Sequence, residues 1–153
     1  MPVTYRIDKA RGIIRTRCVG AVTFDEVIGH FRELEHALEC AERLDVLLDL
    51  SELASLPHAH QLRAVGQEIG RIGDRIRFDH CAIVARTDVV FGMMRMFEVF
   101  AAERFRSIGV FREEGEAETW LTSQALQDGR GDRRSGAPDP PVGRPGQRDR
   151  TVF

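Results

Sequence analysis

Two groups of polar and ionisable side chains follow apolar segments of this sequence, and together they could bind or transform a ligand. One group provides an acid, two hydroxyls and an imidazole after the run at 45–50; the other provides a cation, a hydroxyl and an acid after the run at 81–85. In open α/β sheets, ligands bind outside the carboxyl ends of the strands, where helix N-termini offer free N–H groups. If both runs are parallel strands, the two groups share one rim. The residues of this predicted binding rim are Asp49, Ser51, Ser55, His58, Arg86, Thr87 and Asp88.

A serine, a histidine and an aspartate at this rim raise the question of nucleophilic catalysis. The sequence contains neither the GxSxG nucleophile elbow nor a glycine-rich phosphate loop. Asp88 suits the role of a helix cap, and Ser51 and Ser55 suit turns. We therefore predict a binding or regulatory rim and assign no catalytic residue. A hydrolase would need Ser51 or Ser55 within hydrogen-bonding reach of His58.

The imidazoles of His58, His60 and His80 could in principle bind zinc. His58 follows one predicted strand, whereas His80 precedes the next, so parallel strands would place them at opposite ends of the sheet. On a helix, His58 and His60 would be two residues apart and would not face each other. The sequence therefore predicts no metal site, and we expect no cofactor.

Composition narrows the class of protein. The 153 residues suit one domain, and 42% apolar with 30% charged residues is typical of a globular chain. The net charge of −2 favours no specific nucleic-acid partner. Three widely spaced cysteines without a CxxC pair indicate reduced thiols. With no apolar leader and no apolar run of about 18 residues, we expect a cytoplasmic protein without a transmembrane segment.

Alternating and helical periodicities predict the order β-β-α-β-α-β-α-β-α. Strands that alternate with helices imply parallel crossovers, so we predict an α/β fold with a mixed, mainly parallel five-stranded sheet and helices on both faces. The predicted strands are 3–8, 13–19, 45–50, 81–85 and 108–111, and the predicted helices span 23–43, 57–73, 88–104 and 114–126.

The sequence divides into a domain at 1–126 and a tail at 127–153. Glycine, proline, arginine and aspartate dominate the tail, and almost nothing in it is apolar before its last two residues. Such a segment cannot bury enough surface to offset the entropy of ordering it. We predict that the tail is disordered.

The helix predicted at 88–104 carries more apolar surface than one sheet face requires. Its apolar side chains cover an arc well beyond the ~100° that a helix packed on one face usually needs. We assign the surplus mainly to Phe91, Met94 and Phe97. These residues predict a homodimer interface or a groove for an apolar ligand. Alternatively, Trp120 and Leu121 of the last helix cover the surplus within one protomer.

Four segments carry a family resemblance: TFDEVIGHFRELE, DVLLDLSEL, FGMMRMFEVFAAERFR and VFREEGEAETWL. Together with the order of elements, they resemble the SpoIIAA-like, or STAS, domains of anti-sigma-factor antagonists. Within that group the chain is most similar to uncharacterised bacterial STAS/SEC14-like proteins. The resemblance covers about residues 3–122, and it implies an α/β binding module.

The resemblance fails at the residues that switch the antagonists. In those domains, an Asp-Ser-Ser/Thr-Gly element follows the DLS segment, and a partner kinase phosphorylates its hydroxyl. Here the corresponding stretch is Pro57-His58-Ala59-His60, which lacks a phosphoacceptor. Phosphorylation at that position therefore cannot operate in this chain.

These observations favour a non-catalytic binding or regulatory module that acts through contact with a protein partner or with a second copy of itself. The alternative, suggested by the lipid-transfer relatives, is a carrier or sensor of a small, lipid-like apolar ligand. A small hydrolase that uses the predicted binding rim is the third reading.

Overall fold

The computed structural model describes residues 2–37, 43–55, 57–73 and 76–128. Within these ranges, the elements follow the predicted order. The strands are β1 Val3–Asp8, β2 Ile13–Ala21, β3 Arg43–Ser55, β4 Arg77–Val84 and β5 Ser107–Phe111, and the helices are α1 Phe24–Ala37, α2 Ala59–Ile72, α3 Asp88–Ala101 and α4 Glu114–Gln127. The last helix ends one residue beyond the predicted domain boundary. From residue 129 onward, the tail predicted to be disordered lies outside the described residues.

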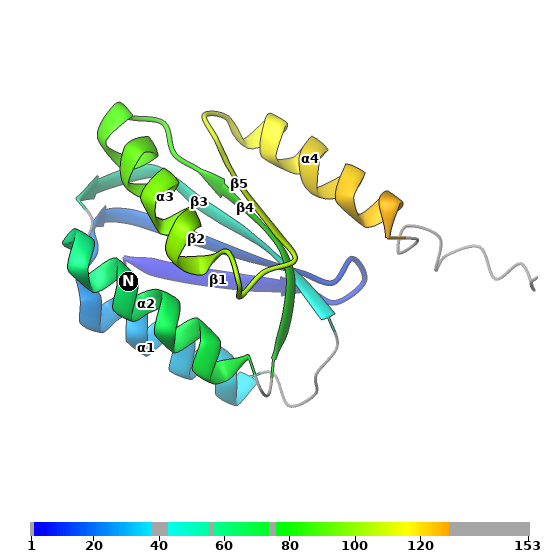
Figure 1. Ribbon diagram of the computed structural model, residues 1–153, viewed down its shortest axis with the longest axis horizontal. Helices are drawn as coiled ribbons and strands as arrows, with labels where there is room; N and C mark the ends of the chain where they lie inside the picture. The colour runs from blue at the N-terminus through cyan, green and yellow to red at the C-terminus, as the bar shows by residue number, and fades with distance from the viewer. Residues whose placement is uncertain (1, 38–42, 56, 74–75, 129–153) are drawn as a thin grey trace, which may run out of the picture.

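The five strands form one sheet in the order β1-β2-β3-β4-β5. The first pair is antiparallel and the other three pairs are parallel, which confirms the predicted mixed, mainly parallel sheet. Helices α1, α2 and α3 cover one face, and α4 lies alone on the other (Figure 1). The core follows this division: Leu50 and Ile83 pack toward α2 and α3, whereas Leu47 packs with Leu121 of α4.

The antiparallel hairpin turns at Gly12. Its φ of +65° lies in the left-handed region that glycine adopts without steric cost. The Gly12 N–H donates to the carbonyl of Asp8 at 2.9 Å and closes the turn. The hairpin places β2 beside β3, where the parallel part of the sheet begins.

Strand β3 is longer than the predicted segment at 45–50. It continues to Ser55 because its last residues pair with β2, with Glu52 opposite Val19 and Ser55 opposite Ala21. The pairing of β3 with β4 ends at Asp49. The last residues of β3 therefore pair with β2 alone, and this pairing is compatible with their polar side chains. The prediction that this strand ends at residue 50, with Ser51 and Ser55 in turns, is therefore wrong.

The N-cap of helix α3 lies one residue before the predicted cap. The N-cap is Thr87, whose hydroxyl accepts a hydrogen bond from the Val90 N–H at 3.3 Å. Asp88 is the first residue of the helix, and its carboxylate pairs with Arg112 at 2.8 Å. The assignment of Asp88 as the cap is wrong because Thr87 already has the extended backbone and the oxygen that a cap requires.

Candidate functional site

The first half of the predicted binding rim lies on β3. Asp49 accepts a hydrogen bond from the Ser51 N–H at 2.9 Å, so these two half-buried residues satisfy each other locally. Ser55 is exposed at the strand end. Within the described residues, no hydrogen bond joins Ser51 or Ser55 to His58. The geometric condition for a hydrolase at this rim is therefore not met.

Arg112 organises the second half of the predicted binding rim, and the sequence did not lead us to predict this residue. Arg112, directly after β5, donates to the carbonyl oxygen of Arg86 at 3.1 Å and to Asp88 Oδ1 at 2.8 Å. Its guanidinium carbon also lies 4.2 Å from the centre of the Phe91 ring, within the range of a cation–π contact. A basic residue that follows a parallel strand reaches the same rim as its neighbours, and that position was the available signal. A shared binding role for the seven rim residues stays a prediction.

The two histidines at the start of α2 do face each other. Their rings stack with centroids 5.7 Å apart and planes only 9° from parallel. The prediction that the two rings would not face each other assumed that both residues are helical. His58 is instead the N-cap, with extended backbone angles (φ −63°, ψ 157°), and its N–H donates to Gln61 Oε1 at 2.9 Å.

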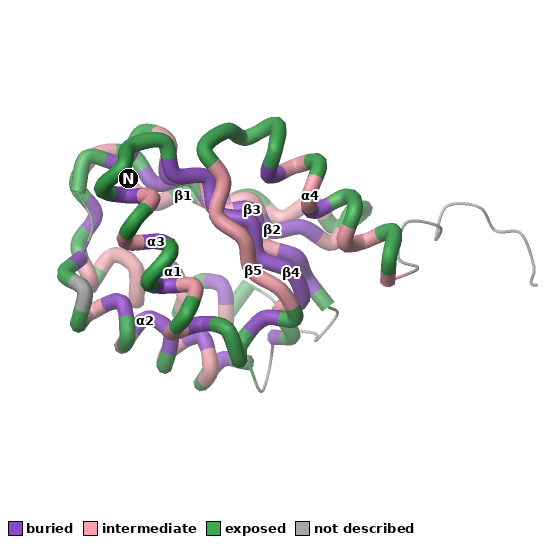
Figure 2. Tube along the Cα trace, turned by 45° about the horizontal axis from the view of Figure 1, so that its top comes forward, coloured by how far each residue is buried: buried purple, intermediate pink, exposed green. Residues whose placement is uncertain are grey.

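Helix α3 divides its apolar residues between two faces. Met94 and Phe97 belong to the buried core and are 3% and 5% exposed, so a surface contact through these two side chains is not available. Figure 2 shows buried and exposed positions mixed along the helices. The exposed apolar residues of α3 are instead Val89, Met96 and Val99, which we call the α3 outer stripe. Large apolar side chains therefore lie on both faces of α3, with Met94 and Phe97 on the buried face. The role in apolar-ligand binding predicted for Phe91, Met94 and Phe97 stays a prediction.

An apolar cavity of about 100 Å³ lies between the sheet and helices α1, α2 and α3. Met94 and Phe97 contribute to its wall, whereas Phe91 does not. The thiols of Cys18 and Cys81 also face it; burial raises the pKa of both, to about 11 for Cys18, so the thiols stay protonated and uncharged. The wall is therefore almost entirely apolar.

Two residues in the middle of the sheet are less buried than their position predicts, because they line this cavity. Strand β3 is flanked by β2 and β4, and its residues facing the helices should be as buried as any in the chain. Val46 and Leu48 line the cavity and are only partly buried, whereas Leu47 on the opposite face is fully buried. Helices α2 and α3 thus leave space above the centre of the sheet.

One polar pair interrupts the apolar wall. His30 of α1 and Thr16 of β2 are both buried, and the His30 Nε2 atom lies 3.2 Å from Thr16 Oγ1. The other ring nitrogen, Nδ1, is buried without a hydrogen-bond partner among the described residues. Burial lowers the pKa of His30 from its ordinary 6.5 to about 4, so the ring is neutral at pH 7.

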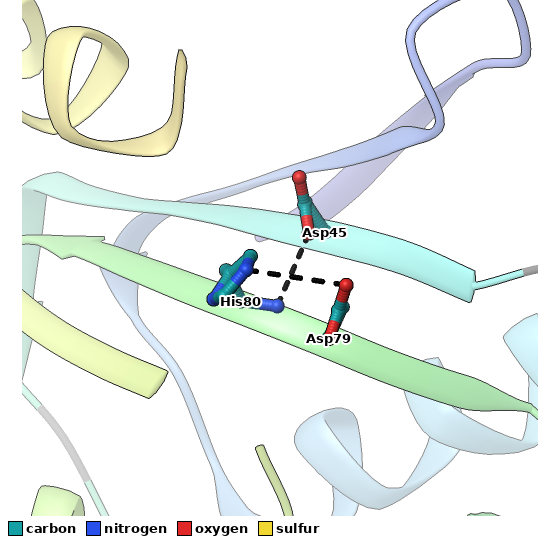
Figure 3. Close-up of side chains that lie close together, drawn as sticks. All are labelled: Asp45, Asp79 and His80. Carbon is teal, nitrogen blue, oxygen red and sulfur yellow. Dashed lines mark hydrogen bonds and ion pairs between the residues drawn. The ribbon is translucent and has the colours of Figure 1, made fainter. Parts of the chain in front are cut away.

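A second buried cluster lies on the other face of the sheet. The register between β3 and β4 shifts at Asp45, so Asp79 and His80 both fall opposite it in a bulge. The His80 N–H donates to Asp45 Oδ1 at 3.1 Å, and its ring faces the Asp79 carboxylate (Figure 3). His80 therefore lies inside β4, where the prediction had placed it before the strand.

The His80 ring joins three elements. Its Nε2 donates to Asp128 Oδ2 at 2.6 Å, just beyond the end of α4, and its Nδ1 lies 2.5 Å from the hydroxyl of Ser107 in β5. With Nε2 as the donor to Asp128, Nδ1 is the atom that accepts a hydrogen bond from the Ser107 hydroxyl. This chain of serine, histidine and aspartate superficially resembles a catalytic triad. However, His80 is only 2% exposed, and neither His80 nor Ser107 lines the apolar cavity.

Ligand atoms of Asp45, Asp79 and His80 lie within 4.8 Å of one another, a spacing that could suit a metal ion. Both nitrogens of the His80 ring already have hydrogen-bond partners, so metal ligation would require breaking one of these bonds. We therefore interpret the cluster as a structural clamp on α4.

Comparisons with known proteins agree with this architecture. Nine chains of solved structures are similar in fold. One is an uncharacterised DUF3478-family protein of Shewanella loihica with a SpoIIAA-like fold; the match has 18% identity and a TM-score of 0.54, and it covers 78% of this chain and 91% of that one. No curated protein matches the sequence. None of the described helices is long and apolar enough to cross a membrane. A family model described as SpoIIAA-like matches residues 13–122, and the chain therefore belongs to the SpoIIAA-like family.

Proposed function

We propose that this protein is a non-catalytic binding module whose ligand is a small apolar molecule held in the cavity beneath α2 and α3. The observation that carries the proposal is the void itself, placed above the centre of the sheet and lined by apolar side chains. Close-packed interiors contain few voids larger than a water molecule. An apolar void of this kind stays dry, so an apolar ligand meets little competition from water.

The size of the cavity limits the ligand. An engineered apolar cavity of about 150 Å³ accepts benzene, and the cavity here is about 100 Å³. The cavity is smaller than that one, so the ligand is at most one small ring or a short alkyl chain. A longer ligand would need α2 and α3 to move away from the sheet. The Thr16–His30 pair gives the ligand one polar group to meet, at a wall that is otherwise apolar.

Benzene should stabilise the protein measurably. At tenfold excess over the dissociation constant, binding to the folded state alone contributes about 1.4 kcal/mol, which raises the melting temperature by about 4 °C. Thermal unfolding at increasing benzene concentration checks this expectation. Val46→Phe should abolish the shift because the added ring occupies the cavity.

Val19→Phe is the matched control for this substitution. It adds the same ring at an exposed position on β2, outside the cavity wall, and should leave the benzene shift unchanged. If Val46→Phe unfolds, Leu48→Phe offers a second way to fill the same space. No shift in the unmodified protein, or an equal shift after the cavity is filled, would contradict the proposal.

The α3 outer stripe favours a second candidate function, contact with another copy of the chain. Val89 and Val99 are 73% and 74% exposed, and Met96 between them is 37% exposed. With Gly92, these residues follow the spacing of three and four that forms a coiled-coil seam. Arg95 and Glu98 flank the stripe, so two copies of α3 related by a two-fold axis could place opposite charges side by side.

Light scattering at rising protein concentration tests this candidate. We expect a dimer whose dissociation constant rises at least tenfold in Val99→Glu, because the substitution buries a charge at the seam. Leu126→Glu introduces the same charge at an exposed apolar residue on α4, outside the α3 outer stripe, and should leave the dimer intact. A monomer at all concentrations would rule out self-association through α3.

A further inference from the structure

Four arginine side chains surround a pocket of about 320 Å³ at the edge of the sheet where β3, β4 and β5 begin. Arg43 comes from the start of β3 and Arg77 from the start of β4, while Arg104 and Arg106 come from the segment that leads into β5. We call this the arginine pocket. The rest of its wall consists of Gly73, Ile76, Phe78 and Asp79. This edge is opposite to the predicted binding rim.

The charge of the pocket differs from that of the molecule. Four cations and one acid line it, although the whole chain carries a net charge of −2. Arg106 also contacts Asp128 at 3.5 Å. Within the described part of the chain, Arg77 and Arg104 form no ion pair. Like charges gathered at one site repel one another, and an anion between them would relieve the repulsion.

Arg104 lies close to the end of helix α2. Its guanidinium lies against Gly70, near the C-terminal end of α2, where partial negative charge from the helix carbonyls favours a cation. A Cβ atom at residue 70 would lie only 2.5 Å from the guanidinium carbon. Glycine at this position therefore leaves the room that the Arg104 guanidinium occupies.

We propose that the arginine pocket binds a phosphate group. Guanidinium forks bind phosphate oxygens through pairs of parallel hydrogen bonds, and several arginines around one space favour a multiply charged anion over a single carboxylate. The volume exceeds that of one phosphate and is at the lower end of pockets for small organic ligands, so a pyrophosphate or a phosphate ester fits the space. This inference does not depend on the proposed function of the apolar cavity.

Two sources could supply such a phosphate. One is a free phosphorylated metabolite, for which pyrophosphate is the probe. The other is an amphiphile, because Phe78 lines both the arginine pocket and the apolar cavity. A phosphate held by the arginines could then carry a short alkyl chain past Phe78 toward the cavity, and hexyl phosphate is the probe for that source.

Calorimetric titration of the full chain with each probe tests the proposal. We expect at least tenfold weaker binding in Arg104→Gln and in Gly70→Ala, and no comparable change in Arg32→Gln. Arg32→Gln removes the same charge from an exposed position on α1, outside the arginine pocket. Gly70→Ala keeps all four arginines and displaces only the Arg104 guanidinium, so it separates positioning from net charge.

The pattern of binding identifies the source. Tight binding of pyrophosphate supports a free phosphate ligand. Binding of hexyl phosphate alone, weakened in both Arg104→Gln and Val46→Phe, supports an amphiphile. Loss in Arg104→Gln but not in Val46→Phe supports the arginine pocket even if the cavity proposal fails. Binding of neither probe, or equal weakening in Arg104→Gln and Arg32→Gln, would overturn the proposal.

Discussion

Replacing His80 by phenylalanine should lower the free energy of unfolding by about 3 kcal/mol. Phenylalanine keeps most of the ring volume, so little of this loss comes from packing. It removes both ring hydrogen bonds, to Asp128 at 2.6 Å and to Ser107 at 2.5 Å. The bond to Asp128 is the more important of the two, because the Asp128 carboxylate is largely buried and would lose its closest described partner.

A second contact on the same helix provides the control. Glu118 of α4 pairs with Arg15 of β2, and that arginine lowers the pKa of the Glu118 carboxyl. Both side chains are partly exposed to solvent, so Glu118→Gln should cost less than about 1 kcal/mol. Urea denaturation at pH 7 measures both variants. Equal losses in His80→Phe and Glu118→Gln would show that the buried clamp is not what holds α4.

The arrangement of the fold was predictable because periodicity and element order determine it. The alternating hairpin, the two apolar runs and the amphipathic helices led to the mixed five-stranded sheet that the structure has. Boundaries were less predictable. Strand β3 extends to Ser55 because pairing with β2 outweighs the turn preference of Ser51 and Ser55, a tertiary effect that composition does not encode.

The candidate sites were harder to predict from the sequence than the fold was. Helix α3 is apolar around most of its circumference, so its pattern could not say that Met94 and Phe97 face the core while Val89 and Val99 face solvent. A cavity is space that side chains fail to fill, and no residue type marks it. The sequence named Met94 and Phe97 as candidates for an apolar ligand, which stays a prediction, but it gave no sign that Val46 lines the same space.

The sequence contained a signal for the buried cluster around His80. Asp45, Asp79 and His80 are polar residues at the beginning of two apolar strands, where a buried position requires partners. Pairing among these residues across neighbouring strands could therefore have been predicted from the sequence. The bulge that lets both Asp79 and His80 reach Asp45 depends on strand register, which the sequence does not specify.

Lowering the pH from 7 to 4 should destabilise the protein by about 3 kcal/mol through His30 alone. Burial lowers the pKa of His30 in the folded state to about 4, below its ordinary value of 6.5. The unfolded chain therefore takes up a proton first as the pH falls through 6.5, and stability is lost progressively until the folded ring also becomes protonated near pH 4. A difference of about 2.5 pKa units corresponds to about 3 kcal/mol.

Carboxylates and other histidines titrate in the same range, so the measurement must isolate His30. His30→Gln keeps a polar side chain that can reach Thr16 but does not titrate. The difference in unfolding free energy between the unmodified protein and this variant, measured in urea from pH 7 to pH 4, should change by about 3 kcal/mol. An NMR titration should show the His30 ring neutral at pH 6. A ring that protonates above pH 6 would contradict the prediction, because a charged imidazole is incompatible with the apolar wall in which His30 lies.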